Sequence, residues 1–129
     1  MLVVCAIILH HNLILATQRG PGMDLPGKWE FPGGKVDAGE REEEALIREI
    51  EEELALTVRP MHRLQPSVHR YPTKTIELVP YICSLEKGEI RLLEHAACRW
   101  CTAADLPVLD WAEADVPVVN QVLAWLKDV

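Results

Sequence analysis

The sequence has little positive charge, because its 129 residues carry 13 Lys and Arg against 20 Asp and Glu, for a formal net charge of −7. A protein that binds a nucleic acid polymer needs clustered basic side chains to neutralise phosphates. The chain also lacks any apolar run of the roughly 20 residues that a membrane span requires. We therefore expect neither a nucleic acid polymer nor a membrane among its partners.

Cysteine is scarce, and its pattern suggests neither disulfides nor a metal site. Cys98 and Cys101 form a C-x-x-C pair, but no second pair or histidine lies at zinc spacing. Three apart in a strand, their sulfurs would point to opposite faces. The apolar run from Leu2 to Leu9 has no basic start and is far shorter than a membrane span of roughly 20 residues, so it predicts a buried strand. We expect reduced thiols and a cytoplasmic protein.

Length and hydrophobic content predict one domain, 1–129, because 49% hydrophobic residues can bury a core of this size. Two helices are expected, at about 40–54 and about 116–127. Short apolar runs separated by Gly, Pro and Asn predict the strands 2–9, 13–19, 29–31, 58–70, 75–85, 89–93 and 97–102. This order predicts an α/β (α+β) fold, an α/β/α sandwich around a mixed β-sheet.

The acidic charge is concentrated in one segment, since eight Glu and two Arg between Glu40 and Glu53 give a net charge of −6. On a helical wheel, Leu46, Ile47, Ile50 and Leu54 form an apolar stripe. A second cluster lies beside this stripe, formed by Glu49, Glu52 and Glu53. Carboxylates at i, i+3 and i+4 beside a buried stripe favour a site for Mg²⁺ or Mn²⁺. The alternative is a solvated face of a purely structural, Glu-rich domain.

The spacing of this segment carries a family resemblance. Gly34 is followed after five residues by Glu40, and after seven more by Arg48-Glu49-Ile50-Glu51-Glu52-Glu53-Leu54-Ala55-Leu56. This resembles the Nudix box, G-x5-E-x7-R-E-U-x-E-E-x-G-U with U aliphatic, at every specified position except one. Ala55 stands where the family has Gly, and Ala is the poorer residue in a left-handed helix cap.

The resemblance implies a hydrolase that cleaves nucleoside diphosphates linked to another moiety, using a divalent metal. Glu49, Glu52 and Glu53 would be metal ligands, together with Gly33 and Glu94. Arg48 would orient the ligands through an ion pair with a box carboxylate, and Glu40 would support the loop or an outer metal. The general base is left open between Glu49 and Glu94.

Similarity extends over nearly the whole chain to the MutT-type members, which convert nucleoside triphosphates to monophosphate and pyrophosphate. It rests on the segment Trp29-Glu30-Phe31-Pro32-Gly33-Gly34-Lys35 and on Gln18-Arg19. The resemblance implies that Arg19, Lys35 and Lys74 contact phosphates, with Gly34 beside them. Phe31 and Trp111 are candidates to stack on the base, and His69 and Tyr71 would face the base pocket.

Asp115 occupies the position that reads the base in these enzymes, where MutT has Asn. An ionised carboxylate only accepts hydrogen bonds, whereas an amide also donates. The first hypothesis is a Mg²⁺-dependent 8-oxo-dGTP pyrophosphohydrolase that acts as a monomer on a small-molecule nucleotide. CTP-preferring relatives carry Asp here, so a CTP or 5-methyl-dCTP pyrophosphohydrolase is the alternative. A non-catalytic nucleotide-sensing module is the alternative from another class.

Overall fold

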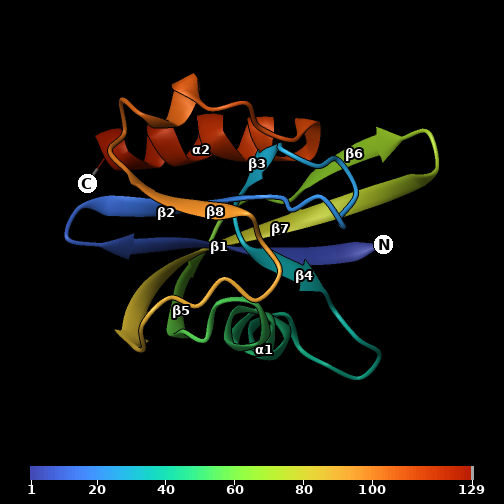
Figure 1. The fold of residues 1–129 in the computed structure, drawn as a ribbon, viewed down its shortest axis with the longest axis horizontal. Coiled ribbons are helices and arrows are strands. Elements are labelled where there is room, and N and C mark those ends of the chain that lie inside the picture. Colours follow the sequence, from blue (N-terminus) through green and yellow to red (C-terminus); the bar gives the residue numbers. More distant parts are fainter. Residues whose placement is uncertain (129) are drawn as a thin grey trace.

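The structure, a computed structural model that describes residues 1–128, consists of one mixed β-sheet with a helix on each side (Figure 1). The helices are α1 (Glu42–Leu54) and α2 (Val116–Lys127), and two short 3₁₀ turns, η1 (Leu106–Val108) and η2 (Glu113–Asp115), precede α2. The strands are β1 (Leu2–His10), β2 (Leu13–Gln18), β3 (Trp29–Glu30), β4 (Gly33–Lys35), β5 (Thr57–Arg63), β6 (Ser67–Tyr71), β7 (Lys74–Lys87) and β8 (Ala97–Cys101).

The sheet has the order β3-β2-β1-β7-β5, with β4 paired to β1, β6 to β7 and β8 to β2. Only β1 and β7 run parallel, in register from Leu2 opposite Glu77 to Leu9 opposite Ser84, and the other pairs are antiparallel. The prediction of a mixed sheet is therefore confirmed. Because β4 pairs with β1 beside β7, the segment leading into α1 is fixed at the middle of the sheet.

The core has two parts, one on each face of the sheet, because successive side chains of a strand point to opposite faces. From β1, Cys5 and Ile7 pack in the cluster that contains Val118 and Val122 of α2. Val4, Ala6 and Ile8 pack in the other cluster, with a stripe from α1 formed by Ala45, Leu46, Ile50 and Leu54. The predicted α/β/α sandwich is therefore confirmed, with α1 and α2 covering opposite faces (Figure 1).

Several predicted bounds were wrong. The helix begins at Glu42 and not at residue 40, because Gly39 has φ +81° and Arg41 is extended. The predicted strand 58–70 is divided into β5 and β6, which both pair with β7. Residues 89–93 form no strand. The N–H groups of Arg91 and Leu93 instead donate to the carbonyls of Leu54 and Glu53 at the end of α1.

The four cysteines are free thiols, as predicted. Cys98 packs against the α1 side of the sheet and Cys101 lies in the α2-side core, so the C-x-x-C sulfurs do point to opposite faces. Among residues 1–128, no helix is both long enough and apolar enough to cross a membrane.

Candidate active site

Helix α1 begins and ends with conformations that the surrounding sequence supports. Glu44 Oε1 accepts the backbone N–H of Arg41 at 3.0 Å, which satisfies one of the unpaired donors at the helix start. Ala55 ends the helix in the left-handed region, with φ 58° and ψ 29°, and its N–H donates to Glu51 O. The left-handed cap of the Nudix box is therefore present, although Ala replaces Gly.

Two glycines of β4 allow close approach to other parts of the site. A Cβ on Gly33 would lie 1.9 Å from the carbonyl oxygen of Val4, and a Cβ on Gly34 would lie 2.3 Å from the carboxylate of Glu49. Gly33 would meet backbone and therefore requires glycine, whereas a side chain at Gly34 would force the carboxylate of Glu49 to move. The absence of a side chain on Gly34 allows Glu49 to lie directly against the backbone of β4.

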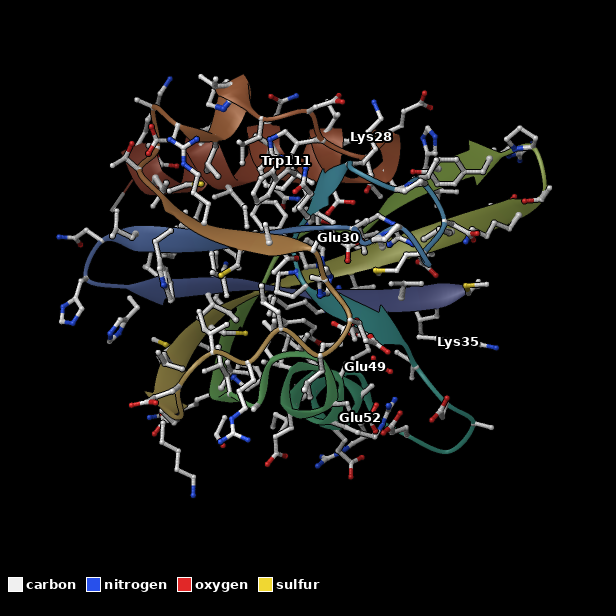
Figure 2. All side chains as sticks on the ribbon, viewed as in Figure 1. Lys28, Glu30, Lys35, Glu49, Glu52 and Trp111 are labelled. Atoms are coloured by element: carbon white, nitrogen blue, oxygen red, sulfur yellow. The ribbon has the colours of Figure 1, made fainter. Side chains whose placement is uncertain are left out.

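Arg48 links the box carboxylates to each other. Its Nε and Nη2 contact the two oxygens of Glu40 at 2.7 and 2.9 Å, and its Nη1 contacts Glu49 Oε1 at 2.7 Å and Glu52 Oε2 at 3.2 Å. The carboxylates that hold this guanidinium raise the pKa of Arg48 above its ordinary value. Figure 2 shows Glu49 and Glu52 on α1, on the side of the helix that faces β4 and Lys35. Arg48 thus has the ion pairs that the resemblance implied for it.

Glu53 is the buried member of the acidic cluster. Its carboxyl Oε1 accepts the N–H of Gly33 at 3.2 Å, and the residue is 6% exposed. Burial and the neighbouring carboxylates of Glu30, Glu49 and Glu94 raise the pKa of Glu53 to about 9. Burial, with Glu52 and Glu94 nearby, also raises the pKa of Glu49. The structure therefore brings Glu94, from a loop about 40 residues away, next to the box carboxylates.

This environment fits a hard divalent cation. A buried carboxyl among other carboxylates retains a proton unless a cation replaces it, and Mg²⁺ prefers such oxygen ligands. Within residues 1–128, no three acidic, His or Cys side chains stand in ready chelating positions. Glu49 and Glu52 each contact Arg48 through one carboxylate oxygen and keep the other, and the ligand roles of Glu49, Glu52, Glu53, Gly33 and Glu94 stay predictions.

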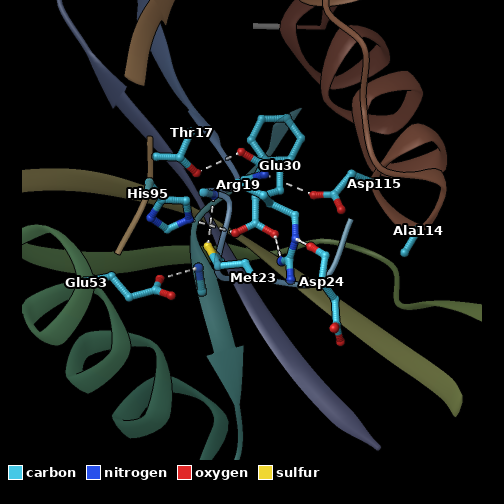
Figure 3. A network of polar contacts seen from close by, with 12 residues as sticks. Thr17, Arg19, Met23, Asp24, Glu30, Glu53, His95, Ala114 and Asp115 are labelled. Atoms are coloured by element: carbon cyan, nitrogen blue, oxygen red, sulfur yellow. Dashed lines mark hydrogen bonds and ion pairs between the residues drawn. The ribbon is translucent and has the colours of Figure 1, made fainter. Parts of the chain in front are cut away.

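A second polar cluster, which the sequence did not predict, lies above Glu53 (Figure 3). Glu30 on β3 contacts Arg19 Nη1 through Oε1 at 2.5 Å and His95 Nε2 through Oε2 at 2.8 Å. Arg19 also donates from Nε to the carbonyl of Asp24. Arg19 was expected as a phosphate contact, and the structure shows that it is held by a carboxylate. The only signal for Glu30 and His95 was their position next to predicted site residues.

One cavity of about 460 Å³ connects the two clusters. All six residues predicted to bind substrate line it, namely Arg19, Phe31, Gly34, Lys35, Lys74 and Asp115. Glu30 and Glu53 also line it. Lys74 stands at 3.4 Å from Asp24, in an ion pair between two walls of the cavity. Cations, the buried Glu53 and Asp115 therefore share one cavity, with Glu30 and Arg19 close enough to Asp115 to affect its pKa.

Asp115 is a buried polar group in the wall of this cavity. Its Oδ2 accepts the backbone N–H of Phe31 at 2.9 Å, and the residue is 6% exposed. Burial and the nearby carboxylate of Glu30 raise the pKa of Asp115 to about 8. Near neutral pH the carboxyl group therefore keeps its proton, so it can donate one hydrogen bond as well as accept others.

Two expected contacts with the base are not supported by the geometry. Trp111 does not line the cavity. It packs behind Phe31 with ring centroids 4.6 Å apart, and its Nε1 donates to Leu106 O. His69 faces Glu113, with Nε2 at 3.0 Å from the carboxylate, and does not line the cavity. Tyr71 does line it, and its hydroxyl accepts the N–H of Ala114.

Comparisons with known proteins agree with this geometry. Residues 1–126 match the NUDIX domain. An 8-oxo-dGTP diphosphatase from Haemophilus influenzae is 43% identical over 110 residues, covering 85% of this chain and 81% of that protein. A CTP pyrophosphohydrolase from Escherichia coli is 32% identical over 122 residues, covering 95% and 90%.

A solved structure is similar as well. The MutT protein of methicillin-resistant Staphylococcus aureus, a Nudix hydrolase, is 40% identical with a TM-score of 0.77, and the match covers 97% of this chain and 98% of that one. The box spacing, the fold and the match over nearly the whole chain agree, and the chain belongs to the Nudix hydrolase family.

Proposed function

We propose that this protein hydrolyses a nucleoside triphosphate to the monophosphate and pyrophosphate with Mg²⁺, and that 8-oxo-dGTP is its preferred substrate. The observation that carries the proposal is the single cavity that joins Asp115 to Arg19, Lys35, Lys74 and Glu53. A nucleotide supplies groups that match this lining, a base for Asp115 and a polyanion for the three cations. Two relatives named 8-oxo-dGTP diphosphatase or CTP pyrophosphohydrolase support the class of substrate.

Each part of the site has a task in this reaction. Arg19, Lys35 and Lys74 bind the phosphate oxygens. Nudix hydrolases use divalent metal ions, and here the carboxylates of Glu49, Glu52 and Glu53 would hold Mg²⁺, which neutralises phosphate charge and lowers the pKa of a bound water.

A carboxylate must also accept the proton of the attacking water. Glu49 is paired with Arg48 at 2.7 Å. Among residues 1–128, Glu94 has no ion-pair partner, although it lies beside Glu53. The lack of a cationic partner supports Glu94 as the general base, whereas the raised pKa of Glu49 supports Glu49, so both stay candidates.

A protonated Asp115 can pair with 8-oxoguanine or with cytosine, so the preference for 8-oxo-dGTP rests on the 43% identical 8-oxo-dGTP diphosphatase. A neutral carboxyl group donates from one oxygen and accepts at the other, like the amide that MutT carries at this position. Altered guanine presents a carbonyl acceptor next to an N–H donor, which this pair of groups satisfies. Cytosine presents its N4 amine as a donor and N3 as an acceptor, so CTP stays the second candidate, supported by the 32% identical CTP pyrophosphohydrolase.

The test compares kcat/KM for 8-oxo-dGTP, dGTP, CTP and 5-methyl-dCTP with Mg²⁺, measured as pyrophosphate release. We expect the highest value for 8-oxo-dGTP. A higher value for CTP or 5-methyl-dCTP would assign the protein to the cytosine nucleotides. A lack of turnover for every nucleotide, together with an unchanged melting temperature on addition of Mg²⁺, would contradict the enzymatic function and favour the sensing module.

A further inference from the structure

Glu30 connects two parts of the site that come from distant segments. Its carboxylate is 12% exposed, with Oε1 at 2.5 Å from Arg19 Nη1 and Oε2 at 2.8 Å from His95 Nε2. Its backbone is fixed too, because β3 pairs with β2 and the hydroxyl of Thr17 donates to Glu30 O at 3.1 Å. With its backbone fixed, the orientation of the carboxylate depends on the two groups that contact it (Figure 3).

Apolar packing alone does not explain why the imidazole of His95 is buried. Its side chain is fully buried, and its Nδ1 has no hydrogen-bond partner among residues 1–128. An unpaired buried nitrogen is unfavourable, and an apolar side chain of similar volume would avoid it. Because Glu30 only accepts hydrogen bonds when ionised, Nε2 must carry the proton of the 2.8 Å contact. The bond to Glu30 is therefore the one polar interaction that this side chain makes within the described chain.

The backbone around His95 is anchored on both sides. Before it, the N–H of Leu93 donates to the carbonyl of Glu53, and after it the N–H of Ala96 donates to Gln18 O at 2.9 Å. Gln18 precedes Arg19 at the end of β2. A rigid loop thus presents the imidazole to Glu30 from the side that carries Glu94.

We propose that His95 is a positioning residue: by donating its Nε2 proton to Glu30, it orients that carboxylate to hold the guanidinium of Arg19 in the nucleotide cavity. Arg19 lies on the cavity wall with Glu30. Without its hydrogen bond to His95, the carboxylate of Glu30 can rotate. The guanidinium of Arg19 then has one fixed contact left, with the carbonyl oxygen of Asp24. The proposal rests on the proposed function only for the role of Arg19 in binding phosphate.

Two substitutions separate the hydrogen bond from the volume of the side chain. In His95→Gln the side-chain amide can place an N–H near the position of Nε2, whereas in His95→Leu a side chain of similar size has no donor. We expect His95→Leu to lower kcat/KM for the best nucleotide by about tenfold to a hundredfold, the range for a lost hydrogen bond to a charged group. Most of the change should appear as a higher KM, and His95→Gln should recover most of the loss.

Two control variants test whether His95 affects activity through Glu30. In the Glu30→Ala background, where no side-chain acceptor is left for Nε2, adding His95→Leu should have little further effect, because both changes remove the same contact. Arg99→Leu removes an ion pair with Asp105, at 3.3 Å and outside the cavity, and should change kcat/KM by less than about twofold.

The mobility of Arg19 tests the proposal without any substrate. The Nε–H signal of Arg19 in ¹⁵N NMR should show a rigid guanidinium in the wild type and in His95→Gln, and a mobile one in His95→Leu. Equal kinetic losses in the Leu and Gln variants, or an Arg19 signal that His95→Leu leaves rigid, would overturn the proposal. If the wild type hydrolyses no nucleotide, the proposed function fails, and the Arg19 signal still decides the role of His95.

Discussion

Asp115→Asn tests the electrostatics at the base end of the cavity through folding stability. Asp115 is 6% exposed, and burial together with Glu30 raises its pKa to about 8. The pKa of an unfolded aspartate is about 3.9. Asn has nearly the same shape, and its side-chain oxygen can accept the N–H of Phe31 as Oδ2 of Asp115 does. The substitution therefore removes the titration and keeps the contact.

The sign and size of the effect follow from proton linkage. Between about pH 4 and pH 8 the folded state keeps a proton on Asp115 that the unfolded state has released. The contribution of Asp115 to the free energy of unfolding is therefore complete below about pH 4. Its contribution is lost as the pH rises toward 8, by about 1.4 kcal/mol per pH unit. From pH 5 to pH 7 the wild type should therefore lose about 3 kcal/mol relative to Asp115→Asn.

The assay is urea unfolding of both proteins at pH 5, 6 and 7, in EDTA and without nucleotide. Other titrating groups, including Glu53, are common to both proteins, so the difference between the two curves isolates Asp115. Asp110→Asn changes an exposed aspartate, with 73% of its side chain accessible, and is the matched control. A difference between wild type and Asp115→Asn that stays constant over this pH range would refute the assignment of a proton to Asp115.

The sequence predicted the parts of the site that depend on local spacing. The apolar stripe of α1 follows from the helical period, and Leu46, Ile50 and Leu54 are fully buried as expected, but Ile47 is only partly buried and Ala45 joins the core instead. The six predicted substrate-binding residues share one cavity because the resemblance supplied their positions in the fold. Local pattern and family spacing were therefore enough to find the cavity.

The sequence did not predict what depends on contacts between distant segments. Glu30 and His95 are 65 residues apart, and nothing in either segment indicates that they meet. The raised pKa of Asp115 also depends on Glu30, which lies far from it in the sequence. Residues 89–93 alternate like a strand, but their N–H groups contact the open carbonyls at the end of α1, which no local pattern reveals.

Two further predictions concern α1, one about catalysis and one about folding stability. Glu52→Gln should lower kcat by about a hundredfold through loss of a metal ligand, with unfolding free energy unchanged within about 0.5 kcal/mol because 59% of this side chain is exposed. Glu51→Gln on the exposed face is its control, and equal kcat values in these two variants would contradict the role of Glu52. Ala55→Gly should stabilise the protein by about 0.5–1 kcal/mol in urea unfolding, because φ 58° is strained for Ala and relaxed for Gly. Ala124→Gly, at an exposed position inside α2, should destabilise it by about the same amount. Opposite signs for the same chemical change would show that backbone conformation decides the effect, and a loss of stability in both would show that the cap is not strained.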